Sequence, residues 1–306
     1  MTGKGGTGKT TAAAALALAA GGRRTLLVEV EERQGIAQLF DSPPLPYAEK
    51  KIAVAPRGGE VRALAVDVEE ALLEYLDMFY KLGRAGRALK RFGAIDFATT
   101  IAPGLRDVLL TGKVKEAVTR TEKGHRLYDA VVLDAPPTGR IGRFLNVTRE
   151  VAGLTKVGPI KTQSDGVMAV LRSPMTAVHL VTILEEMPVQ ETTDAIAELS
   201  ASGLPVGAVI VNATQPPALA GEKVTQAELK RGLVAAGLPA SKPLVAALAA
   251  EGSARALRST LEERLRGELA ELGRPVLELP FLPDGVDLGA LYTLADSFCA
   301  QGVSAR

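Results

Sequence analysis

A glycine-rich segment near the start of the chain combines the residue types that bind a phosphate chain. Residues 3–10 fit the pattern G-x-x-x-x-G-K-[ST]. Glycines let the backbone turn closely around an anion and point its N–H groups inward. Lys9 would reach the β- and γ-phosphates, Thr10 would bind Mg²⁺ and Thr11 the α-phosphate. The segment therefore predicts a MgATP site held by Gly3, Gly5, Gly6, Thr7, Gly8, Lys9, Thr10 and Thr11.

The elements around this segment follow the order that a phosphate-binding loop requires. Residues 11–20 are rich in alanine, a strong helix former, and a helix that begins near Lys9 would point its positive end at the anion. A short β-type run at residues 25–30 follows. Only two residues precede Gly3, too few for the buried strand that normally leads into such a loop. We expect this first strand to be missing, and a gap at the centre of the sheet is the alternative.

A second apolar run ends in a carboxylate that suits a magnesium site. Residues 128–134 have the near-continuous apolar character of a buried parallel strand. Ligands of parallel sheets bind at the carboxyl ends of the strands, so we expect Asp134 to join Thr10 as a metal ligand. A proline-containing turn then leads to Gly139.

These segments together resemble the deviant P-loop ATPases. Lys4 directly after the first glycine marks that group. Asp-x-x-Pro-Thr-Gly at residues 134–139, followed by Arg-Phe-Leu at 143–145, narrows the resemblance to the ArsA branch. That branch holds arsenite-pump and tail-anchored-protein-targeting ATPases, including actinobacterial ArsA-like ATPases.

The resemblance implies a fold, a dimer and several residue roles. The fold is an α/β P-loop NTPase with a mostly parallel sheet flanked by helices. Lys4 would reach the nucleotide of a partner subunit; a solvated loop lysine is the alternative. Gly139 would sense the γ-phosphate through its backbone. Asn212, at the end of a strand near residues 206–211, would bind the adenine edge, although a cap or turn role is also open.

The first switch departs from the Asp-Pro-Ala-His that is usual in this family. The strand at residues 25–30 places Glu31 where the aspartate positions the attacking water. Glutamate keeps the charge but reaches about 1.5 Å further, and a misplacement of about 1 Å can cost roughly 100-fold in rate. We expect catalytic roles for Glu31, Lys4 and Lys9 and slowed hydrolysis, unless the backbone shifts to suit glutamate. Glu29 is the alternative acid, although we expect it to face elsewhere along the strand.

The composition of the chain limits the kinds of partner that we expect. Lys plus Arg number 36 and Asp plus Glu 35, so the net charge is +1, and we expect no nucleic-acid partner. Cys299 is the single cysteine, so we expect no zinc site and a cytoplasmic protein. No apolar run reaches the roughly 18 residues of a membrane span. The dimer would be a homodimer or a heterodimer with a paralogous subunit, and a protein client or a membrane partner is possible.

We expect one P-loop ATPase domain over residues 1–306. Its core strands are predicted near residues 25–30, 61–67, 128–134, 177–183, 206–211 and 275–279, with helical insertions near 68–125 and 140–173. Residues 256–272 predict a surface helix with five leucines on one face, Leu257, Leu261, Leu265, Leu269 and Leu272. The apolar residues from Leu72 to Tyr80 have helical spacing, which is more typical of a core than of a client groove.

The leading hypothesis is an ATPase that couples MgATP binding and hydrolysis to a conformational change of a dimer. A hydrolysis-impaired regulatory subunit is the first alternative, because glutamate replaces aspartate in the first switch. A partition- or division-type ATPase is the second, and the absence of a basic amphipathic C-terminal helix argues against it.

Overall fold

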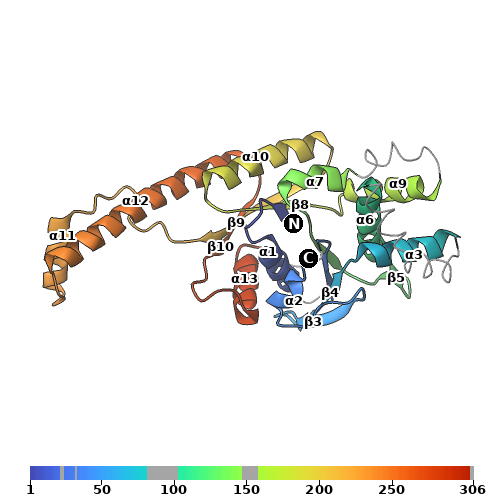
Figure 1. The fold of residues 1–306 in the computed structure, drawn as a ribbon, viewed down its shortest axis with the longest axis horizontal. Coiled ribbons are helices and arrows are strands. Elements are labelled where there is room, and N and C mark those ends of the chain that lie inside the picture. The colour runs from blue at the N-terminus through green and yellow to red at the C-terminus, as the bar shows by residue number, and fades with distance from the viewer. Residues whose placement is uncertain (21–23, 32, 81–102, 147–157, 304–306) are drawn as a thin grey trace.

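The computed structural model describes residues 1–20, 24–31, 33–80, 103–146 and 158–303. Figure 1 shows strands at the centre with helices around them. The strands are β1 (Thr2–Gly3), β2 (Arg24–Glu29), β3 (Lys50–Val54), β4 (Glu60–Ala65), β5 (Thr121–Glu122), β6 (His125–Arg126), β7 (Ala130–Asp134), β8 (Val178–Thr182), β9 (Val206–Thr214) and β10 (Val276–Pro280). The helices are α1 (Lys9–Ala19), α2 (Gly35–Leu39), α3 (Val68–Tyr80), α6 (Pro103–Thr119), α7 (Thr138–Leu145), α9 (Pro159–Leu171), α10 (Glu186–Ala201), α11 (Gln226–Ala235), α12 (Lys242–Glu271) and α13 (Leu288–Ala300).

The sheet has the mostly parallel order expected from the sequence. Strands β4, β2 and β7 pair in parallel, as do β1, β8, β9 and β10. Strand β3, which the sequence did not predict, adds an antiparallel edge to β4. It begins with two exposed lysines, Lys50 and Lys51, and charged side chains of this kind discourage pairing with another chain at a sheet edge. The prediction of an α/β fold with a mostly parallel sheet is confirmed.

The first strand, which we expected to be missing, is present as a two-residue strand at the centre of the sheet. In β1, Thr2 and Gly3 pair with Leu180 and Val181 of β8. On the other side, the amino group of Met1 donates to the carbonyl of Leu133 at 2.7 Å. Residues 1–3 therefore join the two four-stranded groups, β3-β4-β2-β7 and β1-β8-β9-β10, into one sheet at this level.

Helices cover both faces of the sheet. On one face, α1, α2 and α13 enclose a core that includes the alanines of residues 12–19 and Phe298. The small alanine side chains allow α1 to lie close to the strands. On the other face, α3, α6, α7 and α10 enclose a second core that includes Phe144 and Leu199. These two layers fix the ends of α1 and β7, where the phosphate loop and Asp134 lie.

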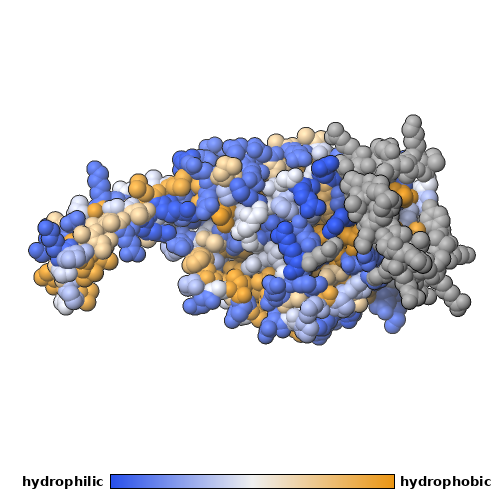
Figure 2. Space-filling view, in the orientation of Figure 1, coloured by the Kyte–Doolittle hydropathy of each residue, from blue (hydrophilic) through white to orange (hydrophobic). Residues whose placement is uncertain are grey.

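Helix α12 is longer than the sequence predicted. Its 30 residues span roughly 45 Å at about 1.5 Å per residue. We name α11 and the first part of α12, residues 226–257, the arm, because Figure 1 shows this segment extending beyond the rest of the fold. Figure 2 shows hydrophobic side chains on the arm, and Val234 and Leu238 there are exposed.

The prediction that the five leucines of residues 256–272 share one face of this helix is partly wrong. Leu265 and Leu269 are fully buried against the body, whereas Leu257 is 74% exposed. Residues spaced by four turn about 40° around a helix at each step. Leu257 therefore lies about 120° away from Leu269 around the helix axis.

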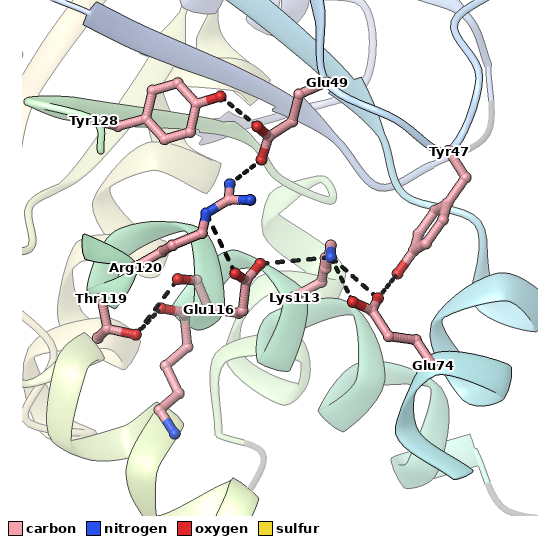
Figure 3. A network of polar contacts seen from close by, with 9 residues as sticks. Tyr47, Glu49, Glu74, Lys113, Glu116, Thr119, Arg120 and Tyr128 are labelled. Carbon is pink, nitrogen blue, oxygen red and sulfur yellow. Dashed lines mark hydrogen bonds and ion pairs between the residues drawn. The ribbon is translucent and has the colours of Figure 1, made fainter. Parts of the chain in front are cut away.

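A network of ion pairs and hydrogen bonds ties α3 and α6 to the sheet. Figure 3 shows its main members, Tyr47, Glu49, Glu74, Lys113, Glu116, Arg120 and Tyr128. Glu49 accepts hydrogen bonds from Arg120 and from the hydroxyl of Tyr128. Glu74 accepts from the hydroxyl of Tyr47 at 2.6 Å and from Lys113 at 2.9 Å. The described part of the region at 68–125 is therefore held to the body by charge as well as by apolar packing.

We expect Glu74 to make the folded state sensitive to acid. Burial alone would raise the pKa of Glu74, but hydrogen bonds from Tyr47 and Lys113 hold it below the usual range. An acid with a lowered folded pKa stabilises the fold at pH values above its unfolded pKa of about 4.3, and this contribution is lost as the pH falls further.

Glu74→Gln should cost about 1 kcal/mol or less at pH 7 and should flatten the fall in stability between pH 5 and 3. Urea unfolding of both chains across this range measures the effect, with the exposed Glu263→Gln as the matched control. Parallel curves for wild type and Glu74→Gln would contradict this assignment.

No helix in the described residues combines the length and apolar character needed to cross a bilayer.

Candidate nucleotide-binding site

The phosphate loop joins β1 to α1 and has the backbone that its glycines permit. Gly6 and Gly8 have φ angles of 86° and 83°, in the left-handed region that favours glycine. A Cβ atom on Gly3 would lie 2.0 Å from the carbonyl oxygen of Val181. A Cβ on Gly8 would lie 2.2 Å from Nδ2 of Asn212. Glycine is therefore required where the loop approaches its neighbouring strands.

Lys9 begins α1 and points back into the loop. Its side chain is buried, and Nζ donates to the carbonyl of Lys4 at 3.4 Å. The Thr7 hydroxyl donates to the same carbonyl at 2.9 Å. Burial lowers the pKa of Lys9, while the carboxylates of Asp134 and Glu31 act to raise it. The ammonium of Lys9 thus lies inside the loop, and its contact with phosphate stays a prediction.

Thr10 and Asp134 meet at the carboxyl end of the sheet. The Thr10 hydroxyl donates to Oδ2 of Asp134 at 2.6 Å. The other oxygen, Oδ1, is buried with no hydrogen-bond partner. Burial raises the pKa of Asp134, against the hydrogen bond from Thr10 and the positive charges of the amino terminus and Lys9. A buried carboxylate oxygen without a partner is costly, so this pair fits a cation that would complete its coordination.

Such a cation would be held by few protein groups. Among the described residues, no cluster of three or more His, Cys, Asp or Glu side chains could form a metal site. Mg²⁺ is commonly bound by one or two carboxylates together with phosphate oxygens and water. The hydroxyl of Thr10 and the carboxylate of Asp134, next to a phosphate loop, are a donor set of that kind.

Glu31 lies at the start of the first switch with two arginines. Its carboxylate is 3.6 Å from Nη1 of Arg140 and 3.8 Å from Nη2 of Arg33. Its side chain is only 16% exposed. These residues line a pocket of about 130 Å³ together with Arg106 and Asp107 of α6. The structure therefore places Glu31 in an electropositive pocket whose field also reaches Lys9.

Glu29, the alternative acid, has a different position. It is 3% exposed at the end of β2, where it pairs in register with Asp134. Its Oε1 accepts the backbone N–H of Gly35 at 3.0 Å, and Oε2 accepts that of Ile36 at 3.4 Å. Glu29 thus anchors the N-terminus of α2. The N-terminus of α2 lies beside the site. A Cβ atom placed on Gly35 would be only 3.3 Å from the methyl group of Thr10.

Lys4 is held by a residue that the sequence did not assign to the site. Its Nζ lies 2.8 Å from Oε1 of Glu191 in α10. The Thr138 hydroxyl, at the first residue of α7, donates to Oε2 of the same carboxylate at 3.1 Å. Glu191 therefore connects the phosphate loop to the second switch.

A family comparison decides the class of the protein. The model of a family described as anion-transporting ATPase matches residues 1–175, more than half of the chain. The chain belongs to this family. As an anion-transporting ATPase family member, it is an ATP-binding ATPase, as the phosphate loop and Lys9 predicted.

Individual relatives support the same assignment. ATPase BagA of Mycobacterium tuberculosis is 57% identical over 314 residues, which cover 99% of this chain and 92% of the relative. ATPase GET3 of Kluyveromyces lactis is 25% identical over 247 residues, which cover 69% of this chain and 70% of the relative. The resemblance to the ArsA branch is therefore confirmed.

Two further predicted residues of this family member lie close to the loop or the switch. Asn212, within β9, donates from Nδ2 to the carbonyl of Thr7 at 3.0 Å. Gly139 is the second residue of α7, where backbone N–H groups lack partners within the helix. The structure thus places Asn212 against the phosphate loop. Its contact with adenine stays a prediction, as does the γ-phosphate contact of Gly139.

Proposed function

We propose that this protein couples the binding and hydrolysis of MgATP to the closing and opening of a dimer. The observation that carries the proposal is the connection from Lys4 through Glu191 to Thr138. It joins the phosphate loop to the first residue of the second switch. A charge that drew Lys4 away from Glu191 would therefore also change the hydrogen bonding of Thr138 and the start of α7.

The binding roles follow from the geometry of the loop. The backbone N–H groups of residues 3–11 would surround the phosphates, and Lys9 would neutralise the β- and γ-phosphates. Thr10 and Asp134 would hold Mg²⁺, which when bound would neutralise further phosphate charge. Asn212, which donates to the carbonyl of Thr7 in the loop, would bind the adenine edge.

In the proposed hydrolysis, water attacks the γ-phosphorus and the bond to ADP breaks, giving ADP and phosphate. Glu31 would orient this water through its carboxylate. The contacts with Arg33 and Arg140 limit where that carboxylate can lie. Loss of the γ-phosphate would then free the backbone of Gly139, and α7 would move as the second switch.

The dimer follows from the position of Lys4. The Lys4 side chain is 33% exposed, so it can reach a second subunit, and its partner Glu191 is equally accessible. We infer that the phosphate of a nucleotide in the facing subunit competes with Glu191 for the ammonium of Lys4. The facing subunit is a second copy of this chain or a paralogue. A protein client, a membrane partner and a cytoplasmic location stay predictions.

Replacing Lys4 tests the coupling directly. We expect the wild-type chain to associate in MgATP more strongly than without nucleotide, because each Lys4 would contact the partner's phosphates. Lys4→Ala should keep ATP binding but lose this nucleotide-dependent association by at least 10-fold in the dissociation constant, about 1.4 kcal/mol. Sedimentation velocity over a range of protein concentrations measures both chains. The matched control is Lys50→Ala, which removes an exposed lysine on β3.

Equal nucleotide-dependent association of wild type and Lys4→Ala would overturn the dimer proposal. It would leave ATP binding by the loop untouched, because Lys9 and the loop glycines do not depend on Lys4. ATP turnover by a chain that never associates with a second subunit would mean that nucleotide is coupled to a conformational change within a monomer.

A second candidate is a nucleotide-binding subunit with impaired hydrolysis. It is favoured by Glu31, since this carboxylate is engaged by two arginines and belongs to a longer side chain than the family aspartate. In that case a paralogous partner would supply the catalytic acid.

A further inference from the structure

The arm is a helical hairpin with a small apolar core of its own. Helix α11 packs against the first part of α12, and a Cβ atom on Gly252 would lie only 2.9 Å from the side chain of Val224, just ahead of α11. Val245 and Ala249 of α12 are buried, although the arm projects from the fold (Figure 1). The two helices are therefore antiparallel, and the turn between them, residues 236–241, lies at the far end of the arm.

Three large apolar side chains at this end are not covered by the hairpin. Val234 is 62% exposed and Leu238 is 55% exposed, and Leu244 is exposed as well. We name residues 230–244 the arm tip. Scattered exposed apolar residues are normal on a protein surface, whereas a group of them in one place indicates a contact surface.

The arm tip is also basic. Its charged residues are Lys230, Arg231 and Lys242, and no acidic residue lies between Glu228 and Glu251. All three basic residues are exposed. Within the part of the chain that the structure describes, none of their side chains forms an ion pair or a hydrogen bond. Figure 2 shows hydrophobic and hydrophilic side chains next to one another at this end of the arm.

The cations of the arm tip differ from the arginines further along the same helix. Arg258 of α12 pairs with Glu262 at 2.7 Å, and Arg264 pairs with Glu186 at 2.9 Å. Charged side chains outside the arm tip thus have partners within the protein. The positive charge of the arm tip is left for an anion from outside the chain.

Apolar and charged groups share one face of the hairpin. Lys230 and Arg231 precede Val234 by four and three residues, and side chains with these spacings are neighbours on a helix surface. Gly237, with a φ of 72°, ends α11, and the N–H of Leu238 donates to the carbonyl of Leu233 at 2.9 Å. The turn therefore holds the backbone of Leu238 in place beside this face.

We propose that the arm tip binds the surface of an anionic lipid bilayer. Val234, Leu238 and Leu244 enter the apolar boundary of the bilayer, and the basic side chains remain at the lipid phosphates, because their long apolar stems let the charge stay in water. An anionic bilayer offers both the apolar layer and the negative charge that this surface complements. A nucleic acid offers the phosphates without the apolar layer. The contact goes beyond the proposed function and does not depend on the nucleotide site.

Vesicle sedimentation with nucleotide-free protein tests the apolar part of the contact. The vesicles contain about one third phosphatidylglycerol in phosphatidylcholine. We expect the wild-type chain to bind them and the double variant Val234→Ser, Leu238→Ser to lower the partition coefficient at least 10-fold, because the buried apolar area is lost. The matched control is Val54→Ser, Leu257→Ser, which also removes one exposed valine and one exposed leucine.

The same vesicles test the charged part of the contact. Lys230→Gln, Arg231→Gln should lower the partition coefficient by about 10-fold. Lys50→Gln, Lys51→Gln on β3 removes the same number of exposed cations and should have little effect. Binding of the wild-type chain should weaken with added salt and with vesicles of phosphatidylcholine alone.

A fluorescent reporter locates the arm tip independently of these losses. The chain contains no tryptophan, so Leu238→Trp introduces a single indole at the turn. We expect its emission to shift to shorter wavelength with the anionic vesicles and to be quenched by brominated lipids. Leu257→Trp, outside the arm tip, should show neither change.

Equal vesicle binding by the wild type and both arm-tip variants would overturn the proposal. Unchanged emission of Leu238→Trp would do so as well. Wild-type self-association that the arm-tip variants lose, without vesicle binding by either, would overturn it too and would assign the arm tip to a second copy of the chain. None of these results bears on ATP binding or on Lys4, because all readouts use nucleotide-free protein.

Discussion

Asp134→Asn is expected to lower MgATP turnover by about 100- to 1000-fold, because a neutral amide cannot replace the carboxylate that would hold the cation. In the structure this carboxylate has one oxygen bound to Thr10 and one buried oxygen without a partner. Turnover under saturating MgATP measures the effect. Asp129→Asn, at the residue directly ahead of the same strand, is the matched control.

The same variant separates a functional role of Asp134 from a structural one. Burial raises the pKa of Asp134, so its ionised form costs stability in the nucleotide-free chain at pH 7. Asp134→Asn should therefore leave the nucleotide-free Tm unchanged or higher. The rise in Tm that MgATP gives the wild type should be lost. A lower nucleotide-free Tm with normal turnover would show that Asp134 acts only in the core.

Glu31→Gln should reduce single-turnover hydrolysis by about 100-fold or more, since the amide cannot accept a proton or orient water as the carboxylate does. ATP binding should be unchanged, because Glu31 lies outside the loop that would hold the phosphates. Glu31→Asp should be slowed as well, because the shorter side chain withdraws the carboxylate by about 1.5 Å. Rapid mixing of excess protein with ATP and Mg²⁺ measures the chemical step.

The aspartate variant decides between the two candidate functions. A slower Glu31→Asp would show that the backbone around Arg33 and Arg140 is adapted to glutamate. A faster Glu31→Asp would contradict our assignment and favour the hydrolysis-impaired subunit. Glu29→Gln is a less suitable probe of chemistry, because Glu29 anchors α2 and its loss would disturb the switch itself.

The sequence by itself determined the phosphate loop, the strand ending in Asp134 and the parallel α/β class. The pattern that predicts each of these features lies within a short stretch of consecutive residues. Loop glycines, a lysine and a hydroxyl in fixed spacing predict an anion site from one short segment. Apolar runs such as residues 128–134 predict buried strands for an equally local reason.

Contacts between distant segments were decided only by the tertiary structure. Lys4 and Glu191 are far apart in sequence, and their ion pair follows from how α10 packs beside β1 and β8. Likewise Glu29 and Glu31 are similar acids two residues apart. The direction of β2 and the start of α2 bury the first and place the second among arginines.

Packing also decided which apolar residues are covered. Periodicity placed Leu257 and Leu269 on one helix face, but Leu269 is fully buried whereas Leu257 is exposed. The sequence raised the alternatives of a missing first strand or a central gap, and the structure shows Thr2 and Gly3 paired with β8 at that position. The pattern of apolar residues determines which side chains prefer burial, whereas the arrangement of strands and helices determines which of them are covered.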